Sequence, residues 1–289
     1  NAPPHAKERA HRLRGVTGAG LRPDIWKRFQ ERFAIPVVYE FYGATEGNVG
    51  VVNFDGRPGM MGRLLPGQMV VRADLATGEL VRDASGHATK VGVNEVGLLV
   101  GQINRMNSFD GYVDRSKNES KVIRNAFGDG KDYFNTGDLV QLHEDGYVSF
   151  RDRTGDTFRW KGENVSTNEV QETLNRFAGV HETNVYGVEV PGADGRAGMV
   201  AVVSDDSFNL EGFAEHVASS LPPYARPLFV RVQPQIAKTG TFKQVKTELR
   251  EQGFDPERST DPVYLLKDGR YVPMTPELHA QIAAGSLRL

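Results

Sequence analysis

The sequence YGATEGN at residues 42–48 follows an apolar run, VVYEF at residues 37–41, that predicts a short buried strand. Its glycines flank a hydroxyl and a carboxylate, Thr45 and Glu46, and an aromatic residue, Tyr42, comes first. Glycine lets a backbone turn tightly and approach a ligand closely, and a carboxylate holds Mg²⁺ together with substrate phosphates. A threonine hydroxyl donates to phosphate oxygens, and an aromatic ring stacks on a base. The stretch favours a nucleotide triphosphate site, although a strand-to-loop turn with a solvated glutamate would explain the same residues.

Three further polar motifs follow along the chain, FNTGD at residues 134–138, DRTGDTFRWKGEN at residues 152–164 and KTGTFK at residues 238–243. This ordered set resembles the adenylate-forming superfamily, which contains acyl-CoA synthetases, luciferases and peptide-synthetase adenylation domains. The residue sequences of these motifs are most similar to one branch, the very-long-chain acyl-CoA synthetases, also called fatty acid transport proteins. GFDP at residues 253–256 is similar to that branch too, and the resemblance covers nearly the whole chain.

The resemblance implies an α+β fold in two parts. Residues 1–154 would form the end of a large adenylate-forming N-terminal domain, including a distorted β-barrel subdomain. Residues 155–289 would form a small, mobile α+β C-terminal domain. The hinge of the family falls on Gly155, where Asp or Lys is more usual, so the choice between Gly155 and Asp156 stays open.

The resemblance also assigns a nucleotide site. It implies that Tyr42 stacks on adenine, that Thr45 contacts phosphate, and that Glu46 is the ligand of Mg²⁺. A carboxylate accepts two hydrogen bonds at once, which suits the two neighbouring hydroxyls of a ribose. The resemblance implies that Asp138 binds these hydroxyls and that Arg153 is a second ribose contact. A surface ion pair is the alternative for these two. The remaining predicted nucleotide contacts are glycine-rich positions, for which a plain turn is the alternative: Gly18, Ala19, Gly20 and Gly43.

Lys243 is the predicted catalytic residue of the second part. Attack of a carboxylate on ATP builds negative charge at the α-phosphate, and an ammonium group placed there would stabilise that charge. Solvated lysines at a helix start are the alternative, because Lys238 and Lys246 lie close by. Gly162 maps to a position that lines the pantetheine tunnel of the family, and a tight-turn glycine explains it equally well.

The predicted function is therefore AMP-forming ligation of a fatty acid to coenzyme A, with ATP, Mg²⁺ and coenzyme A required. Alternatives are an adenylating enzyme that loads a carrier protein, and a lipid-uptake component coupled to acylation. The phosphate loop of the family, rich in Thr, Ser and Gly, is not found upstream of Tyr42. We therefore expect the substrate-binding N-terminal half to be missing and the 289-residue chain alone to be inactive.

The composition excludes several other classes of protein and of site. Hydrophobic residues make up 39% and charged residues 25%, as in globular proteins. A formal charge of −2 gives no basic field for nucleic acid, and the absence of cysteine excludes disulfides, thiolate metal sites and a cysteine nucleophile. Without an apolar run of about 18 residues, we expect a cytoplasmic location, with peripheral membrane association left open.

Local signals predict several elements. Proline followed by an acid at residues 23–24 predicts a helix start, and Asp-Gly at residues 145–146 between alternating runs predicts a hairpin. The sequence STNE at residues 166–169 predicts a capping box. The basic residues of the first 15 positions predict a solvated helix face, with a nucleic-acid or membrane patch as the alternative.

Overall fold

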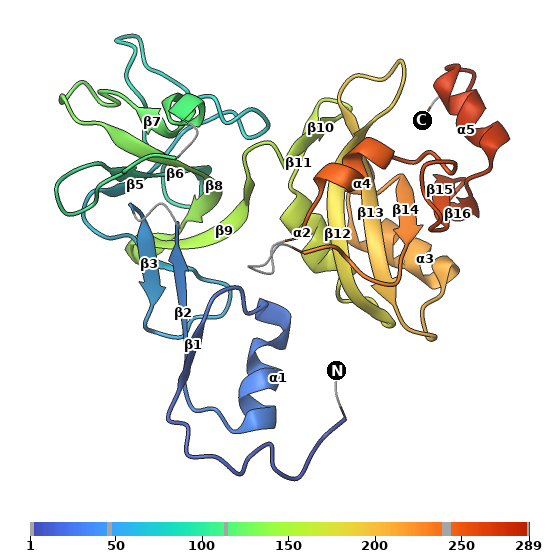
Figure 1. Ribbon diagram of the computed structural model, residues 1–289, viewed down its shortest axis with the longest axis horizontal. Coiled ribbons are helices and arrows are strands. Elements are labelled where there is room, and N and C mark those ends of the chain that lie inside the picture. The colour runs from blue at the N-terminus through green and yellow to red at the C-terminus, as the bar shows by residue number, and fades with distance from the viewer. Residues whose placement is uncertain (1–2, 45–47, 113–114, 239–243, 288) are drawn as a thin grey trace. The chain divides into compact units, whose positions relative to one another are not determined.

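The computed structural model describes residues 3–44, 48–112, 115–238, 244–287 and 289 (Figure 1). Its internal contacts divide the chain into two compact units, unit 1 over residues 1–154 and unit 2 over residues 155–289. Each unit is described by itself. Among the described residues, no helix is both long enough and apolar enough to cross a membrane.

Unit 1 is built on one long mixed sheet. Its strands pair in the order β1-β2-β3-β4-β9-β8-β6-β5, and β7 pairs with β8 outside this path. The strands are β1 (Val16–Gly18), β2 (Val38–Gly43), β3 (Gly50–Asn53), β4 (Gly62–Arg63), β5 (Gln68–Val71), β6 (Val96–Gln102), β7 (Val122–Ile123), β8 (Tyr133–Leu142) and β9 (Tyr147–Arg153). Short 3₁₀ turns lie at η1 (Arg115–Lys117), η2 (Glu119–Lys121) and η3 (Glu144–Gly146).

The α+β class predicted from the sequence is confirmed, but the expected barrel is not closed. In the described part of the chain, β1 and β5 are the two ends of the strand order and do not pair with each other. Most neighbours are antiparallel, whereas β1 and β2 are parallel. A parallel pair needs a crossover connection, and the helix α1 (Pro23–Phe33) supplies it.

Helix α1 starts where the sequence predicts. Pro23 stands at its first position and Asp24 in its first turn, paired with Arg22. The chain leaves the helix through Ala34 in the left-handed conformation (φ 52°). Trp26 is buried from this helix and packs with Ile35 and Val38, so α1 fixes the positions of β1 and β2.

The basic N-terminal segment is not a helix. The described residues before Gly15 form turns and irregular backbone. Arg9 donates to the carbonyl oxygens of Glu31 and Arg32, and His11 contacts that of Phe33. These carbonyl groups belong to the last turn of α1, at the negative end of its dipole, where the helix itself supplies no donors. The basic residues therefore cap α1 and do not form a solvated helix face.

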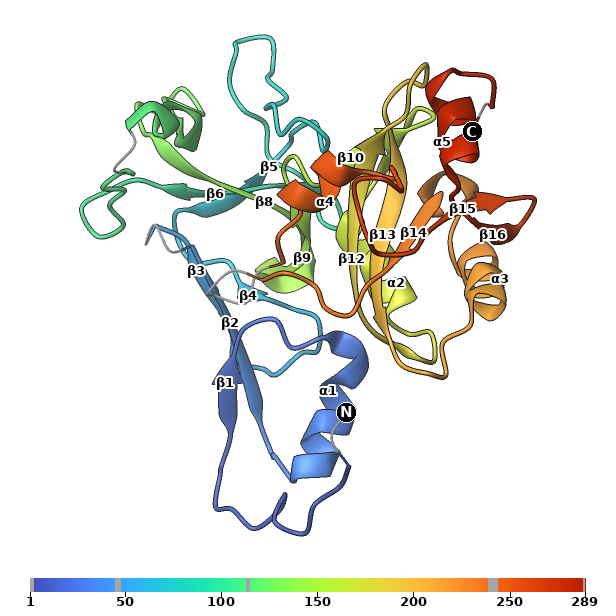
Figure 2. The same ribbon diagram turned by 45° about the vertical axis from the view of Figure 1, so that its right-hand side comes forward.

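Unit 2 has a five-stranded sheet in the order β12-β13-β14-β15-β16 and a separate hairpin, β10-β11 (Figure 2). Its strands are β10 (Phe158–Trp160), β11 (Glu163–Val165), β12 (Val180–Glu189), β13 (Arg196–Ser204), β14 (Phe229–Val232), β15 (Val263–Lys267) and β16 (Arg270–Pro273). Its helices are α2 (Thr167–Leu174), α3 (Leu210–Ser220), the 3₁₀ turn η4 (Pro223–Ala225), α4 (Thr247–Gln252) and α5 (Pro276–Ala283). Ser166 caps α2 by accepting from the Glu169 amide, as the capping box predicts.

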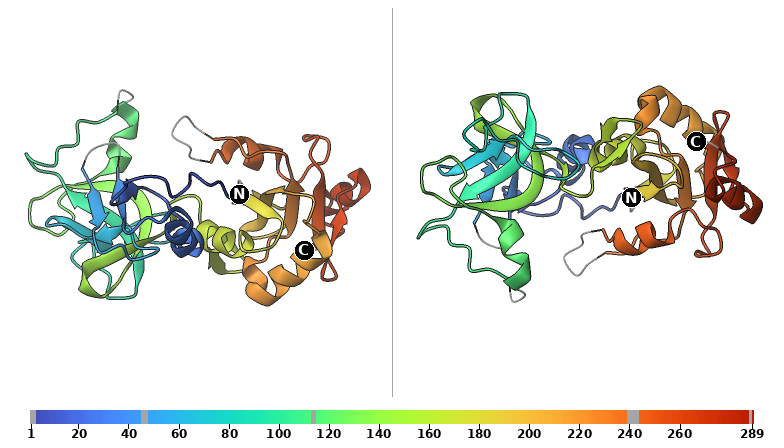
Figure 3. Two further views of the ribbon diagram at one scale, coloured as in Figure 1. Left: turned by 90° about the horizontal axis from the view of Figure 1, so that it is seen from below. Right: turned by 90° about the horizontal axis from the view of Figure 1, so that it is seen from above.

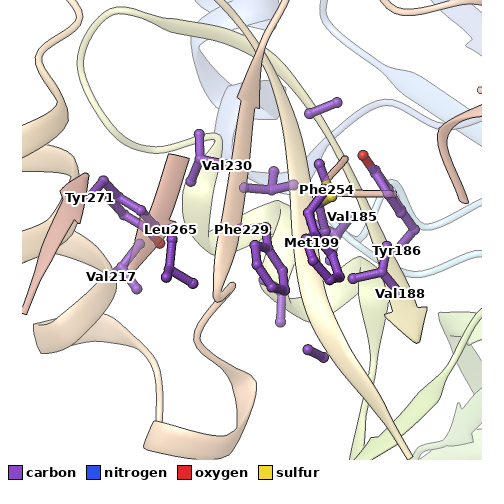
Figure 4. Close-up of a cluster of buried hydrophobic side chains, with 14 of the residues drawn as sticks. Val185, Tyr186, Val188, Met199, Val217, Phe229, Val230, Phe254, Leu265 and Tyr271 are labelled. Atoms are coloured by element: carbon purple, nitrogen blue, oxygen red, sulfur yellow. The ribbon is translucent and has the colours of Figure 1, made fainter. Parts of the chain in front are cut away.

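Helices α3 and α4 lie on opposite sides of this sheet (Figure 3). The core on the α4 side contains Tyr186, Met199 and Phe229, and Phe254 stacks on the ring of Phe229 with centroids 4.2 Å apart (Figure 4). Polar residues share this side of the sheet. Asn184 of β12 and Arg231 of β14 lie opposite Ala201 of β13, one on either side of that strand. Both are fully buried.

Candidate nucleotide site

The FNTGD motif forms a bulge in β8. Leu98 of β6 pairs with Leu139, but Val100 pairs with Asn135, so β8 carries two extra residues at this point. Gly137 adopts φ 78° in the bulge, a conformation that glycine accepts without strain. Thr136 donates to the Leu99 carbonyl at 2.7 Å and accepts from the Asp138 amide at 3.0 Å. Bulges of this kind re-aim a side chain, and here that side chain is Asp138.

Asp138 joins two of the other predicted site residues. It stands opposite Arg153 in the β8–β9 pairing, and its Oδ1 lies 3.1 Å from the Arg153 Nε. The Tyr42 hydroxyl of β2 donates to the other oxygen, Oδ2. The Asp138 side chain is 7% exposed and that of Arg153 is 49% exposed. Each carboxylate oxygen has a second lone pair, so Asp138 retains acceptor capacity for two more donors.

The Tyr42 hydroxyl stays protonated in this arrangement. Burial raises the pKa of Tyr42 well above its usual range, and the negative charge of Asp138 and the hydrogen bond to it raise it further. The hydroxyl is therefore a permanent donor. Its bond to Asp138 fixes the aromatic ring relative to the carboxylate, although the two residues are 96 positions apart.

A cavity of about 340 Å³ lies beside the first two strands, a volume within the range of small-molecule sites. It is lined by Gly18, Ala19 and Gly20 at the end of β1, and by Glu40 of β2. Glu40 accepts from the Gly20 amide at 2.6 Å through Oε1. Its Oε2 is buried and has no hydrogen-bond partner among the described residues. Burial raises the pKa of Glu40, against the opposing effect of the backbone amides of residues 20 and 21.

Glu40 was not singled out from the sequence, although a signal for it exists. In β2, Val38, Glu40 and Tyr42 alternate with the more exposed Tyr39 and Phe41. A glutamate on the inward side of such a strand needs a partner. The cavity is lined by a glycine-rich loop, the carboxylate residue Glu40 and the aromatic residue Tyr39, a combination that suits a flat base with an amino group. The described residues thus fit the adenosine part of a nucleotide.

Nothing in the described chain explains why two of the predicted site residues, Gly18 and Gly43, are glycine. A Cβ atom on Gly18 or Gly43 would meet no described atom within 4 Å, and neither residue has a positive φ. Gly20 differs, because its φ of 82° favours glycine. The described chain therefore leaves open space beside both Gly18 and Gly43.

Gly162 lies in unit 2 in the two-residue turn between β10 and β11. Lys161 and Gly162 have φ values of 51° and 87°, and Trp160 pairs with Glu163 across the turn. Positive φ at both central residues is typical of the tight turns that close hairpins. The backbone therefore accounts for glycine at this position, and a Cβ atom there would meet no described atom within 4 Å.

Thr45, Glu46 and Lys243 lie outside the described residues. Their predicted roles in phosphate contact, Mg²⁺ binding and catalysis stay predictions. Over the part of the chain that the structure describes, no three His, Cys, Asp or Glu side chains group in a way that could hold a metal ion.

At the start of unit 2, Gly155 and Asp156 differ in their surroundings. Gly155 has φ 82°, and no described atom lies within 4 Å of the position of a Cβ. Asp156 is held by two cations, with Oδ2 2.9 Å from Lys246 Nζ and Oδ1 2.7 Å from Arg250 Nη2. Asp156 is therefore held in unit 2 by its side chain, whereas Gly155 contacts the unit through its carbonyl oxygen, which accepts from Arg250 Nη2 at 3.3 Å.

Comparison with known proteins agrees with the motifs. Residues 169–243 match the model of the AMP-binding enzyme C-terminal domain. Long-chain fatty acid transport protein 3 from Homo sapiens is 44% identical over 301 residues, which cover 100% of this chain and 44% of that protein. The chain is a homologue of the long-chain fatty acid transport proteins. The resemblance to adenylate-forming enzymes, drawn from the motifs alone, is confirmed.

A second relative carries an enzyme name. The medium/long-chain-fatty-acid–CoA ligase FadD6 from Mycobacterium tuberculosis is 44% identical over 289 residues, 99% of this chain and 48% of that protein. The chain spans a little under half the length of the curated relatives it matches.

Solved structures of similar fold include one with a bound nucleotide. ATP-bound MatB from Rhodopseudomonas palustris is 25% identical with a TM-score of 0.65, over 81% of this chain and 44% of that chain. The amide bond synthetase McbA from Marinactinospora thermotolerans is also 25% identical, with a TM-score of 0.66, over 86% of this chain and 49% of that chain.

Proposed function

We propose that the natural polypeptide containing this chain is an AMP-forming fatty acid–CoA ligase that uses ATP. The observation that carries the proposal is that Tyr42 of β2 and Arg153 of β9 both contact the carboxylate of Asp138 in β8. Asp138 would accept the two ribose hydroxyls, with Arg153 beside them. The loop at residues 18–20 and Glu40, which line one cavity, would receive the adenine.

The proposed reaction has two steps. The fatty carboxylate attacks the α-phosphorus of ATP, which forms the acyl-adenylate and releases pyrophosphate. The sulfur of coenzyme A then attacks the acyl carbon, and AMP leaves. Lys243 would stabilise the charge that builds at the α-phosphate in the first step, and Thr45 would contact phosphate. Mg²⁺, bound through Glu46, would supply further neutralisation of the phosphate charge.

We further propose that unit 2 turns about Gly155 between the two steps, which would exchange Lys243 for the face that carries Gly162. The contacts of Asp156 support the choice of Gly155, because that carboxylate is bound inside unit 2. Residues 1–154 would then be the end of the large domain, and residues 155–289 the mobile domain.

Two other functions share part of this support. A fatty acid transport component, in which acylation traps imported fatty acid at the cytoplasmic face of a membrane, is favoured by the names of several relatives. An adenylating enzyme that loads a carrier protein would use the same first step. Release of AMP that depends on coenzyme A, without any carrier, separates the ligase from the second of these.

The test compares the two half-reactions in the longest natural polypeptide that contains the chain. Lys243→Ala should lower fatty-acid-dependent ATP–pyrophosphate exchange by about 100-fold or more, while attack of coenzyme A on supplied acyl-adenylate continues. Lys267→Ala is the matched control, because Lys267 is an exposed lysine of the same unit. Equal loss of both half-reactions would refute the division of labour. The 289-residue chain alone should show no exchange.

A further inference from the structure

The residues on either side of positions 239–243 lie next to each other in unit 2. Lys238 and Gln244 form an antiparallel bridge. The Val245 amide donates to the Ala237 carbonyl at 2.9 Å. The two chain ends that flank the segment are therefore paired by their backbones, as at the base of a hairpin.

One carboxylate of β12 contacts both of these ends. Glu182 Oε2 lies 2.8 Å from Lys238 Nζ, and Glu182 Oε1 accepts from Gln244 Nε2 at 2.9 Å. The same Gln244 nitrogen donates to the Thr183 carbonyl at 2.9 Å. Each oxygen of Glu182 thus binds a residue from a different side of the segment. The two charged side chains are about one-third exposed, so water screens the pair only in part.

The backbone of β12 is adapted at this point. The pairing of β12 with β13 shifts between Val180 and Glu182, so that His181 is an extra residue in the strand. Such bulges re-aim the side chains that follow. Two positions further along, the side-chain Nδ2 of Asn184 donates to the Val245 carbonyl at 3.3 Å. The strand therefore offers two successive polar contacts to the segment that leads into α4.

The lysine after the segment is also held. Lys246 Nζ binds Asp156 and, at 3.0 Å, the hydroxyl of Thr167. Both lysines that compete with Lys243 for the catalytic role thus have acidic partners inside unit 2. This arrangement gives Lys238 and Lys246 an anchoring task and separates them from the chemistry proposed for Lys243.

We propose that Glu182 is a positioning residue for the first half-reaction. It holds Lys238 and Gln244 together, and these are the two described residues that flank positions 239–243. Lys243 precedes Gln244 directly in the sequence, so a change at Glu182 removes a contact of the residue next to the proposed catalytic lysine. The inference rests on the proposed function, because it needs Lys243 to act in adenylation.

The experiment uses the longest natural polypeptide and measures ATP–pyrophosphate exchange, attack of coenzyme A on supplied acyl-adenylate, and thermal stability. Glu182→Ala should lower kcat for exchange by about 10- to 100-fold, because a displacement of about 1 Å costs that much. The coenzyme A step, the KM for ATP and the unfolding temperature should change little. Glu189→Ala is the matched control, since Glu189 lies on the same strand and pairs only with Arg196 at the surface among its described contacts.

A charge exchange distinguishes positioning from general stabilisation. Glu182→Lys places two ammonium groups together and should reduce exchange at least as much as the alanine variant. The double variant E182K/K238E restores an ion pair in reverse, although a lysine cannot accept from Gln244 Nε2, so it should recover part of the exchange rate that E182K loses.

The outcomes separate the two hypotheses. A wild-type protein without fatty-acid-dependent exchange would overturn the proposed function. An active wild type whose E182A variant matches the Glu189→Ala control would overturn the inference alone. Parallel loss of both half-reactions in E182A, or no recovery in the double variant, would also overturn it, because Glu182 would then act only on the stability of the unit.

Discussion

Asp156→Asn removes a charge on which two cations of unit 2 depend. Asp156 binds Lys246 at 2.9 Å and Arg250 at 2.7 Å, and the three side chains are 25%, 14% and 29% exposed. Burial acts to raise the pKa of Asp156, but the charges and hydrogen bonds of the two cations outweigh it, and the pKa lies below its usual range. The contact therefore stabilises the folded unit.

The expected loss lies between that of a surface pair and that of a buried pair. Two charge-assisted hydrogen bonds set an upper limit of about 6 kcal/mol. Lys246 keeps its bond to Thr167, and Arg250 keeps one to the Gly155 carbonyl. We therefore expect the free energy of unfolding of unit 2 to fall by about 2–3 kcal/mol, or its midpoint by about 8–12 °C.

The chain carries its own reporters for this measurement. It has two tryptophans, Trp26 in unit 1 and Trp160 in unit 2, and both are buried. In a Trp26→Phe background the remaining fluorescence reports unfolding of unit 2, and in a Trp160→Phe background that of unit 1. Denaturant titrations of each background, with and without D156N, should show a shift only in the transition that Trp160 reports.

The pH dependence has a definite sign. The folded pKa of Asp156 is below the unfolded value of 3.8, so the stabilisation is present above pH 3.8 and is lost as the pH falls through the folded pKa. The difference between wild type and D156N should be full at pH 7 and shrink in acid. A difference under about 0.5 kcal/mol at pH 7, the size typical of a surface change, would refute the reasoning, as would an equal shift in unit 1.

Three further predictions concern single positions. Gly195→Ala should destabilise unit 2 by about 2 kcal/mol or more, because its Cβ would lie 2.1 Å from the Arg159 carbonyl at φ 84°; the Trp160 transition reports this, and no shift would contradict it. The raised pKa of Glu40 means that unit 1 loses stability as the pH rises above 4.5 through the folded value; the Trp26 transition should show that slope, and Glu40→Gln should remove it. Asp138→Asn should weaken AMP binding to the natural polypeptide about 10- to 100-fold by calorimetry, the loss of charged hydrogen bonds, whereas the exposed control Asp145→Asn should not.

Local signals in the sequence were sufficient for several elements. The start of α1, the cap of α2 and the Asp-Gly hairpin turn depend on interactions within a few residues. At that turn, Asp145 and Gly146 have φ values of 62° and 73°. The residues that make such contacts are neighbours in the sequence, so the contacts can be predicted without knowledge of the rest of the fold.

Long-range pairing could not be predicted in the same way. The interruption at Gly137 suggests two strands, yet β8 continues through it as a bulge. Whether the sheet closes depends on β1 and β5, which lie 50 or more positions apart in the sequence, and no local pattern encodes their pairing. The contact between Tyr42 and Asp138 is of this kind. The resemblance named both residues, but only the structure shows that they touch.

The burial of polar groups was the other feature that the sequence did not predict. Glu182 and Arg231 read as ordinary surface charges of a strand, whereas Arg231 is fully buried and donates to Gln252 and to the Gly253 carbonyl at the end of α4. The sequence shows alternation but not which strand face a short helix covers. Only the packing of α4 on the sheet reveals why Arg231 lies there.

The most direct test of the proposed chemistry is the fate of the nucleotide. The longest natural polypeptide that contains the chain should be incubated with ATP, Mg²⁺, coenzyme A and a fatty acid, and the nucleotides separated. Formation of AMP and pyrophosphate in equal amounts with acyl-CoA, dependent on both the acid and coenzyme A, is the predicted result. Release of ADP, or no acid-dependent turnover of ATP, would contradict it.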